Sequence, residues 1–176
     1  MIVEQGLLNE NIALLIQARG LLEKIGDEIY THEASPATSS AAKHFRHIFS
    51  HYETLLKSAS LKIDYETRER GTEVESSRHA ALNKADELLA ALPGLLANIP
   101  EGLPLRVERI VRLPHGKLEA VEYASSLARE LDFVHQHTVH HFAVIALILA
   151  QHGVNVSPDF GMSPSTLRFR AALASP

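Results

Sequence analysis

The chain has 176 residues, of which 45% are apolar and 22% charged, and its formal net charge is −4 with neutral histidines. This length and composition predict one folded domain over residues 1–176 rather than a disordered chain. No block of Lys and Arg stands out, so the charge pattern of a nucleic-acid-binding protein is absent. The sequence has no Cys, which excludes disulfides, thiolate metal ligands and a cysteine nucleophile.

The N-terminal sequence MIVEQGLLNE lacks the basic start and apolar core of a signal peptide. The longest apolar run, residues 142–150, is far shorter than the ~20 residues that span a bilayer. We therefore expect a soluble, cytoplasmic protein that does not cross a membrane.

The first two predicted elements are amphipathic helices. Apolar residues recur at three-, four- and seven-residue steps through residues 4–30, which predicts the first helix. Gly26 weakens this helix without an obvious stop. The second helix is predicted to begin at a cap formed by Thr38 or Ser39 and to run to about residue 60.

Two more helices are predicted in the second half of the chain. The third starts at Asp64, a capping residue, and ends or kinks at Pro93 and Gly94. Residues 105–113, LRVERIVRL, alternate in polarity and could pair as a short strand, which we interpret as part of an extended crossover. The fourth helix is predicted over residues 118–152.

The elements together predict an all-α fold, a four-helix bundle with a long crossover before the fourth helix. Gly153 is a natural residue for the C-terminal end of that helix. The C-terminal tail is predicted to pack on the bundle through Phe160 and Phe169. Bundles of this kind build metal sites from inward-pointing side chains on facing helices.

Histidines concentrate on the second and fourth helices. His137 and His141 are four residues apart, so they lie one turn apart on the same helix face. His44, His47 and His51 follow one another at steps of three and four on the second helix. A set of three imidazoles from two helices leaves coordination positions open for water or substrate, which is typical of a catalytic metal site.

The chain resembles the DinB-like family of small four-helix metalloproteins. That family has one histidine midway along its second helix and an H-x-x-x-H pair on its fourth. The matching segments here are SSAAKHFRHIFSHYETLL at 39–56 and HTVHH at 137–141. Further similar segments are DYETRER at 64–70, ARELDFVHQHTVHHFAVIAL at 128–147 and DFGMSPSTLR at 159–168.

The resemblance implies a single DinB-like domain whose metal ligands are His47, His137 and His141. His44 and His51 share a stripe with His47, and His140 lies beside His141, so these three are alternative ligands. His135 is expected to face away from the site. Characterised relatives include metal-dependent transferases that join low-molecular-weight thiols to electrophiles, and many other relatives have no assigned activity.

An all-imidazole site suits zinc or nickel, and also iron or copper. Because the chain has no Cys, a thiol ligand would come from the substrate, and a metal-bound thiol is deprotonated and nucleophilic. The expected function is therefore a metal-dependent thiol S-transferase acting on a small molecule. Three alternatives stay open: a metal-dependent hydrolase, a non-catalytic metal-binding protein of bacterial stress responses, and a helical interaction protein with incidental histidines. A homodimer is compatible with each of these.

Four further residues are candidates for the surroundings of the metal. Glu130 lies seven residues before His137 on the same face, so it is the carboxylate expected to orient a ligand imidazole. Tyr65 and Arg68 fall in a segment that resembles the family, where they could hold an anionic end of a substrate. Tyr30, at the end of the first helix, is a candidate lining residue.

Overall fold

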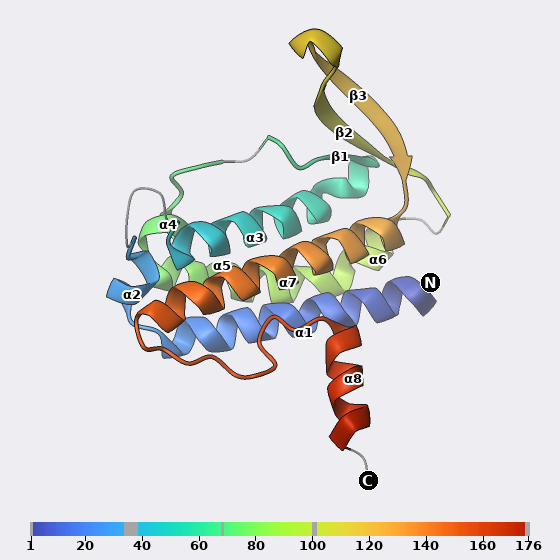
Figure 1. Cartoon of the computed structure of the whole chain (residues 1–176). Coiled ribbons are helices and arrows are strands. Elements are labelled where there is room, and N and C mark those ends of the chain that lie inside the picture. The colour runs from blue at the N-terminus through green and yellow to red at the C-terminus, as the bar shows by residue number, and fades with distance from the viewer. Residues whose placement is uncertain (1, 34–38, 68, 100–101, 175–176) are drawn as a thin grey trace.

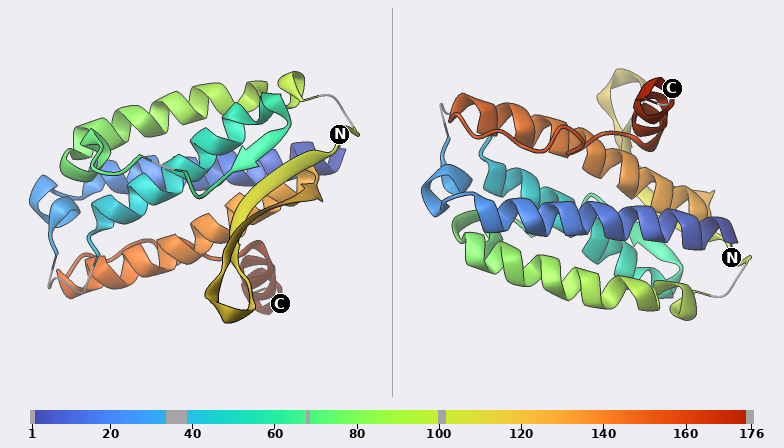
Figure 2. Two further views of the ribbon diagram at one scale, coloured as in Figure 1. Left: turned by 90° about the horizontal axis from the view of Figure 1, so that it is seen from above. Right: turned by 90° about the horizontal axis from the view of Figure 1, so that it is seen from below.

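The structure, a computed structural model, describes residues 2–33, 39–67, 69–99 and 102–174. Four long helices lie side by side (Figure 1). They are α1 (Ile2–Lys24), α3 (Ala41–Leu56), α5 (Arg78–Ala91) and α7 (Leu127–Gln151). Helices α1 and α3 each pack against both α5 and α7, and Figure 2 shows this arrangement from two further sides. The fold is mostly helical, but it is not all-α, because a small sheet stands at one end of the helices.

The first predicted helix is two helices. Helix α1 ends at Lys24, and the short α2 (Asp27–Thr31) begins after Gly26. Gly26 has an extended backbone with ψ 156°, which a continuous helix does not allow. For α3 the N-cap is Ser40, whose hydroxyl accepts a hydrogen bond from the Lys43 N–H. The predicted cap Ser39 is therefore one residue early, and Thr38 lies outside the described residues.

The segment predicted to begin the third helix is not helical. After a 3-10 turn (Lys57–Ser60), Lys62–Asp64 form strand β1, and the chain then returns along α3 to α4 (Glu73–Ser76) and α5 (Figure 1). The Asp64 carboxylate accepts hydrogen bonds from the N–H groups of Glu66 and Thr67, so it caps a turn rather than a helix. Because α3 and α5 start at the same end of the bundle, the lengthwise crossover lies between them, not before α7.

Residues 105–125 form a β-hairpin that extends beyond the helices. Strand β2 (Leu105–Arg112) pairs in parallel with β1 and antiparallel with β3 (Leu118–Ser125). The alternating run therefore is a strand, but the first eight residues assigned to the fourth helix are its partner strand. Helix α7 begins only after Ser126, whose hydroxyl accepts from the Arg129 N–H. The remaining short elements are η2 (Leu92–Gly94), α6 (Leu95–Asn98), η3 (Pro114–Gly116) and the C-terminal α8 (Pro164–Ala174).

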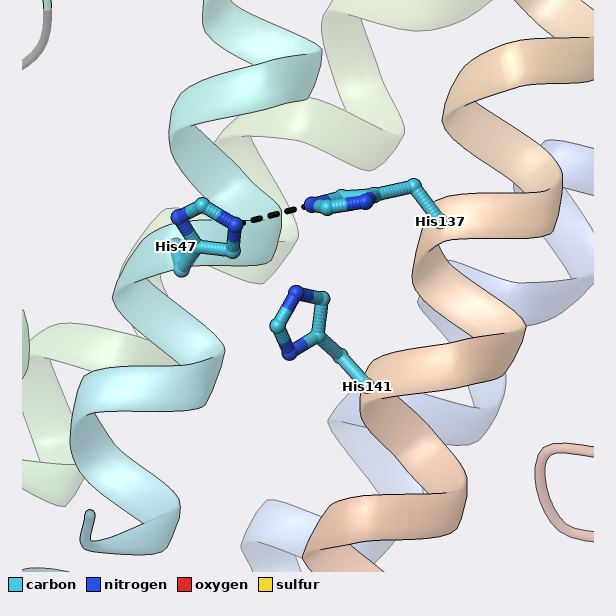
Figure 3. Close-up of side chains that lie close together, drawn as sticks. All are labelled: His47, His137 and His141. Atoms are coloured by element: carbon cyan, nitrogen blue, oxygen red, sulfur yellow. Dashed lines mark hydrogen bonds between the residues drawn. The ribbon is translucent and has the colours of Figure 1, made fainter.

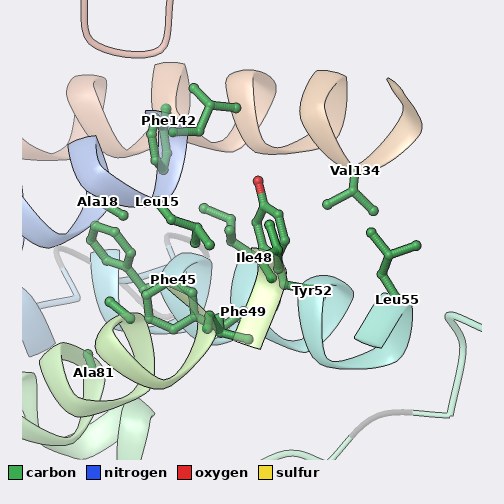
Figure 4. Close-up of a cluster of buried hydrophobic side chains, with 14 of the residues drawn as sticks. Leu15, Ala18, Phe45, Ile48, Phe49, Tyr52, Leu55, Ala81, Val134 and Phe142 are labelled. Carbon is green, nitrogen blue, oxygen red and sulfur yellow. The ribbon is translucent and has the colours of Figure 1, made fainter. Parts of the chain in front are cut away.

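The core lies among the four helices and is rich in aromatic rings from α3 (Figure 4). The tail joins this core through Phe160, whose ring stacks on Phe142 with 4.4 Å between centroids. Gly161 has φ +67°, and a Cβ there would lie 2.6 Å from Cβ of Phe142, so only glycine allows this approach. Phe169 does not pack as predicted: it is 64% exposed on α8, which projects from the bundle and has no buried residue.

In the part of the chain that the structure describes, α7 alone is long and apolar enough to cross a membrane, judged by length and composition. Core helices of soluble proteins share these properties, and α7 packs along α1 and α3. The absence of a membrane partner and the cytoplasmic location stay predictions.

Candidate metal centre

Three histidines from two helices point toward one another at the α3–α7 interface (Figure 3). His47 extends from α3, and His137 and His141 extend from successive turns of α7. The Nε2 atoms of His47 and His137 are 2.8 Å apart. One ring nitrogen from each histidine lies within 4.8 Å of the others, so the cluster could hold a metal ion. All three side chains are half-buried, which leaves the cluster accessible from one side.

A buried hydrogen-bond network sets the register of the two helices behind this cluster. The Tyr52 hydroxyl of α3 donates to the Asn11 side chain of α1, and the Thr138 hydroxyl of α7 lies 3.3 Å from the same Tyr52 oxygen. Asn11 in turn donates to the Leu131 carbonyl of α7. Tyr52 and Thr138 are buried and directly follow His51 and His137 in the chain. The network therefore fixes the positions from which the imidazoles extend.

The two other histidines of α3 also contact the cluster. Nδ1 of His44 lies 2.8 Å from Nδ1 of His141. Nδ1 of His51 lies 2.8 Å from the His47 carbonyl oxygen, which can only accept a hydrogen bond. His51 therefore carries a proton on Nδ1. The His51 ring lies 4.2 Å from the His137 ring, between centroids.

Burial and repulsion from neighbouring histidines lower the pKa values of His44 and His141. Burial first, and then the charges of neighbouring histidines with His137 the largest contributor, together lower the pKa of His141 to about 3. Burial also lowers the pKa of His44, with a smaller contribution from His140. A neutral imidazole has a lone pair to offer, which is the form that binds a metal ion.

The other two histidines of α7, His135 and His140, lie outside the cluster. His140 is exposed, and its ring meets that of His141 edge-on at 5.3 Å. His135 is 3% exposed, and burial lowers its pKa despite the opposing charges of Glu10 of α1 and of Asp132. His135 thus belongs to the α1 side of the helix.

An aromatic wall of Tyr65 and Phe133 flanks the cluster. The Tyr65 ring stacks on His51 with 5.2 Å between centroids and 17° between planes. Phe133 stacks on His137 at 5.7 Å and contacts Tyr65 at 5.1 Å. Phe133 was not among the residues predicted from the sequence, although it lies four residues before His137, the spacing at which helix side chains meet.

The other predicted neighbours have different surroundings. Glu130 is 4% exposed and accepts a hydrogen bond from the Ser125 hydroxyl at 2.5 Å. Tyr30 is fully buried, and its hydroxyl donates to the Val74 carbonyl, so it is a core residue rather than a lining residue. Arg68 lies outside the described residues.

Comparison with known proteins leaves the family open. No family model matches the chain, and no solved structure matches it. The chain is similar to the FK506-binding protein 5 of Rhizopus delemar, with 25% identity over 122 residues. This match covers 68% of the chain but 31% of that protein, so the chain spans about a third of its relative. An identity this low over part of a protein assigns neither a family nor an activity.

Proposed function

We propose that the chain is a metal-dependent transferase of the DinB-like type, which joins a small thiol to an electrophile. Its divalent ion, zinc or nickel in the first place and iron or copper as alternatives, would be held by His47, His137 and His141. The observation that carries this proposal is the convergence of three ring nitrogens within 4.8 Å from two different helices. The resemblance of both histidine-bearing segments to that family supports the reaction class.

The donor set fits a divalent cation. The facing Nε2 atoms of His47 and His137 are 2.8 Å apart, so without a metal they share one proton between two lone pairs. A cation can replace that proton, and the lowered pKa of His141 keeps the third ring neutral. Three nitrogen ligands suit zinc and nickel and leave positions open for a substrate.

The surrounding side chains support thiol chemistry. A divalent ion bound there would favour the thiolate form of an incoming thiol, which is the nucleophile in such transfers. Tyr65 and Phe133 stack on His51 and His137 and so form an apolar flank of the site. In the reaction the thiol proton leaves to solvent, sulfur bonds to the electrophilic carbon, and the leaving group departs with the electron pair.

The first test is elemental analysis of untagged protein together with a thiol-dependent transfer assay. We expect one equivalent of metal in the parent protein and loss of both metal and turnover in His47→Ala and His141→Ala. His79→Ala, at an exposed position of α5, is the matched control and retains both. Full turnover in metal-free protein would contradict the proposal.

A second candidate is a metal-binding stress protein without catalysis. It is favoured by the extra imidazoles His44 and His51, which contact the cluster and could close the coordination shell. X-ray absorption of the metal-loaded protein separates the two functions. Four or five imidazoles and no exchangeable water support binding alone, whereas three imidazoles and an exchangeable ligand support the transferase.

A further inference from the structure

Glu130 is a buried carboxylate without a countercharge. It is 4% exposed, accepts a hydrogen bond from Ser125, and forms no ion pair with any described residue. Burying an unpaired charge is costly, so such groups are usually compensated by a partner or a ligand. The Tyr65 hydroxyl is also buried and lies close enough to Glu130 to hydrogen-bond to it.

A cavity of about 410 Å³ opens beside this carboxylate, between the end of β3 and the first turn of α7. Its lining includes Ser125, Ser126, Arg129 and Glu130. The Arg129 guanidinium lies 5.7 Å from the centre of the Phe133 ring and has no ion pair within the described ranges. The cavity is thus lined by a cation, Arg129, and an anion, Glu130, that form no ion pair with each other among the described residues. Adjacent helix residues point in different directions, so the two charges lie on different walls.

We propose that this cavity binds the zwitterionic end of an α-amino acid. Glu130 receives the ammonium group of the ligand, and Arg129 receives its carboxylate. Burial and the charge of Glu130 both raise the pKa of Tyr65, so its hydroxyl stays protonated beside the Glu130 carboxylate.

The choice of ligand rests on the proposed function and on the spacing between the cavity and the histidine cluster along α7. Glu130 precedes His137 by seven residues, which is two turns or roughly 10 Å along α7 on the same face. An extended dipeptide spans roughly 7 Å. The side chains of Glu130 and His137 shorten the distance along α7 that such a ligand has to cover. The inferred substrate is therefore a thiol whose sulfur is separated from a free amino-acid end by about one residue.

The test is calorimetric binding to zinc-loaded protein of γ-glutamylcysteine and two analogues. N-glutarylcysteine lacks the amino group, and N-(4-aminobutanoyl)cysteine lacks the α-carboxylate, while all three retain the thiol. We expect each analogue to bind at least about tenfold more weakly, the size of one hydrogen bond to a charged group. Equal affinities for the three compounds, or no binding of any, overturn the subsite.

Variants assign each charge to its residue. Arg129→Gln should weaken γ-glutamylcysteine at least about tenfold and leave the analogue without the α-carboxylate unchanged. Arg112→Gln, which removes an exposed arginine of the hairpin, is the control of equal charge change and should affect neither. Glu130→Gln should likewise weaken the binding of γ-glutamylcysteine and leave the binding of N-glutarylcysteine, which lacks the amino group, unchanged. If Arg129→Gln and Arg112→Gln behave alike, the proposal fails, whatever Glu130→Gln does to folding.

S-methyl-γ-glutamylcysteine separates this proposal from the metal function. It retains both charges but cannot supply a thiolate. The S-methylated forms of the two analogues are compared with it. If the affinities of the S-methylated compounds still depend on the two charges while zinc has no effect on thiol binding, the subsite stands and the metal function fails. If zinc strengthens binding of all thiols and their affinities do not depend on the two charges, the metal function stands and the subsite fails.

Discussion

Nδ1 of His44 and Nδ1 of His141 lie 2.8 Å apart across the α3–α7 interface. Two ring nitrogens at this distance hold one proton between them. If that proton belongs to His141, its Nε2 keeps the lone pair that a metal ligand needs, and His44 orients the ring. His44 is then a positioning residue rather than a ligand.

This arrangement makes a prediction about His44. His44→Ala should weaken zinc binding about 10–100-fold without abolishing it, because the hydrogen bond that holds the His141 tautomer is lost. Competition with a chromophoric chelator measures the affinity. His140→Ala, at the exposed neighbour of His141, is the control and should have little effect. Complete loss of binding in His44→Ala would instead make His44 a ligand.

A second prediction concerns the pH dependence of the metal-free protein. His141 has an ordinary pKa of 6.5 when unfolded and a pKa of about 3 in the fold, because burial disfavours its charged form. Between these values the unfolded state binds more protons, so stability must fall as pH drops from about 6.5 towards 3. Urea unfolding at several pH values measures this slope. We expect His141→Gln to flatten it and His79→Gln to leave it unchanged.

Zinc itself should stabilise the fold. A ligand that binds only the native state raises stability by about 2.7 kcal/mol at a concentration one hundred times its dissociation constant. Thermal unfolding with and without zinc should therefore show a higher Tm in the loaded protein. His137→Ala should abolish the shift. A similar shift in that variant would place the bound zinc elsewhere.

The buried network behind the site should contribute to stability. Tyr52→Phe removes the hydroxyl that bonds to Asn11 and leaves a buried amide oxygen without its donor, which costs about 1–3 kcal/mol. Tyr123→Phe, on the half-exposed face of β3, is the matched control and should change stability by less than about 0.5 kcal/mol. Denaturant unfolding of both variants checks the difference.

The tail offers a matched pair of phenylalanines. Phe160→Ala should destabilise the protein by about 3 kcal/mol or more, because its ring is buried on Phe142. Phe169→Ala should have an effect within about 0.5 kcal/mol, because that ring is exposed on α8. Equal losses in the two variants would show that α8 packs on something in solution.

The sequence alone predicted the features that depend on local periodicity. A four-residue spacing places His137 and His141 on one helix face whatever surrounds them, and the repeating apolar stripes predict the long helices. The alternation in residues 105–113 identifies a strand in the same way. These patterns predicted most of the helical architecture and the pair His137 and His141, whereas the choice of His47 among the three histidines of the second helix came from the resemblance to the DinB-like family.

Other features were decided by contacts between distant segments. Residues 118–125 are a strand because they pair with β2, although their sequence also suits the start of a helix. The link between His44 and His141 and the burial of Glu130 likewise depend on where the hairpin and α3 lie against α7. Periodicity assigns a residue to a face of its own element, whereas its charge state and its partners depend on what the folded chain places opposite that face.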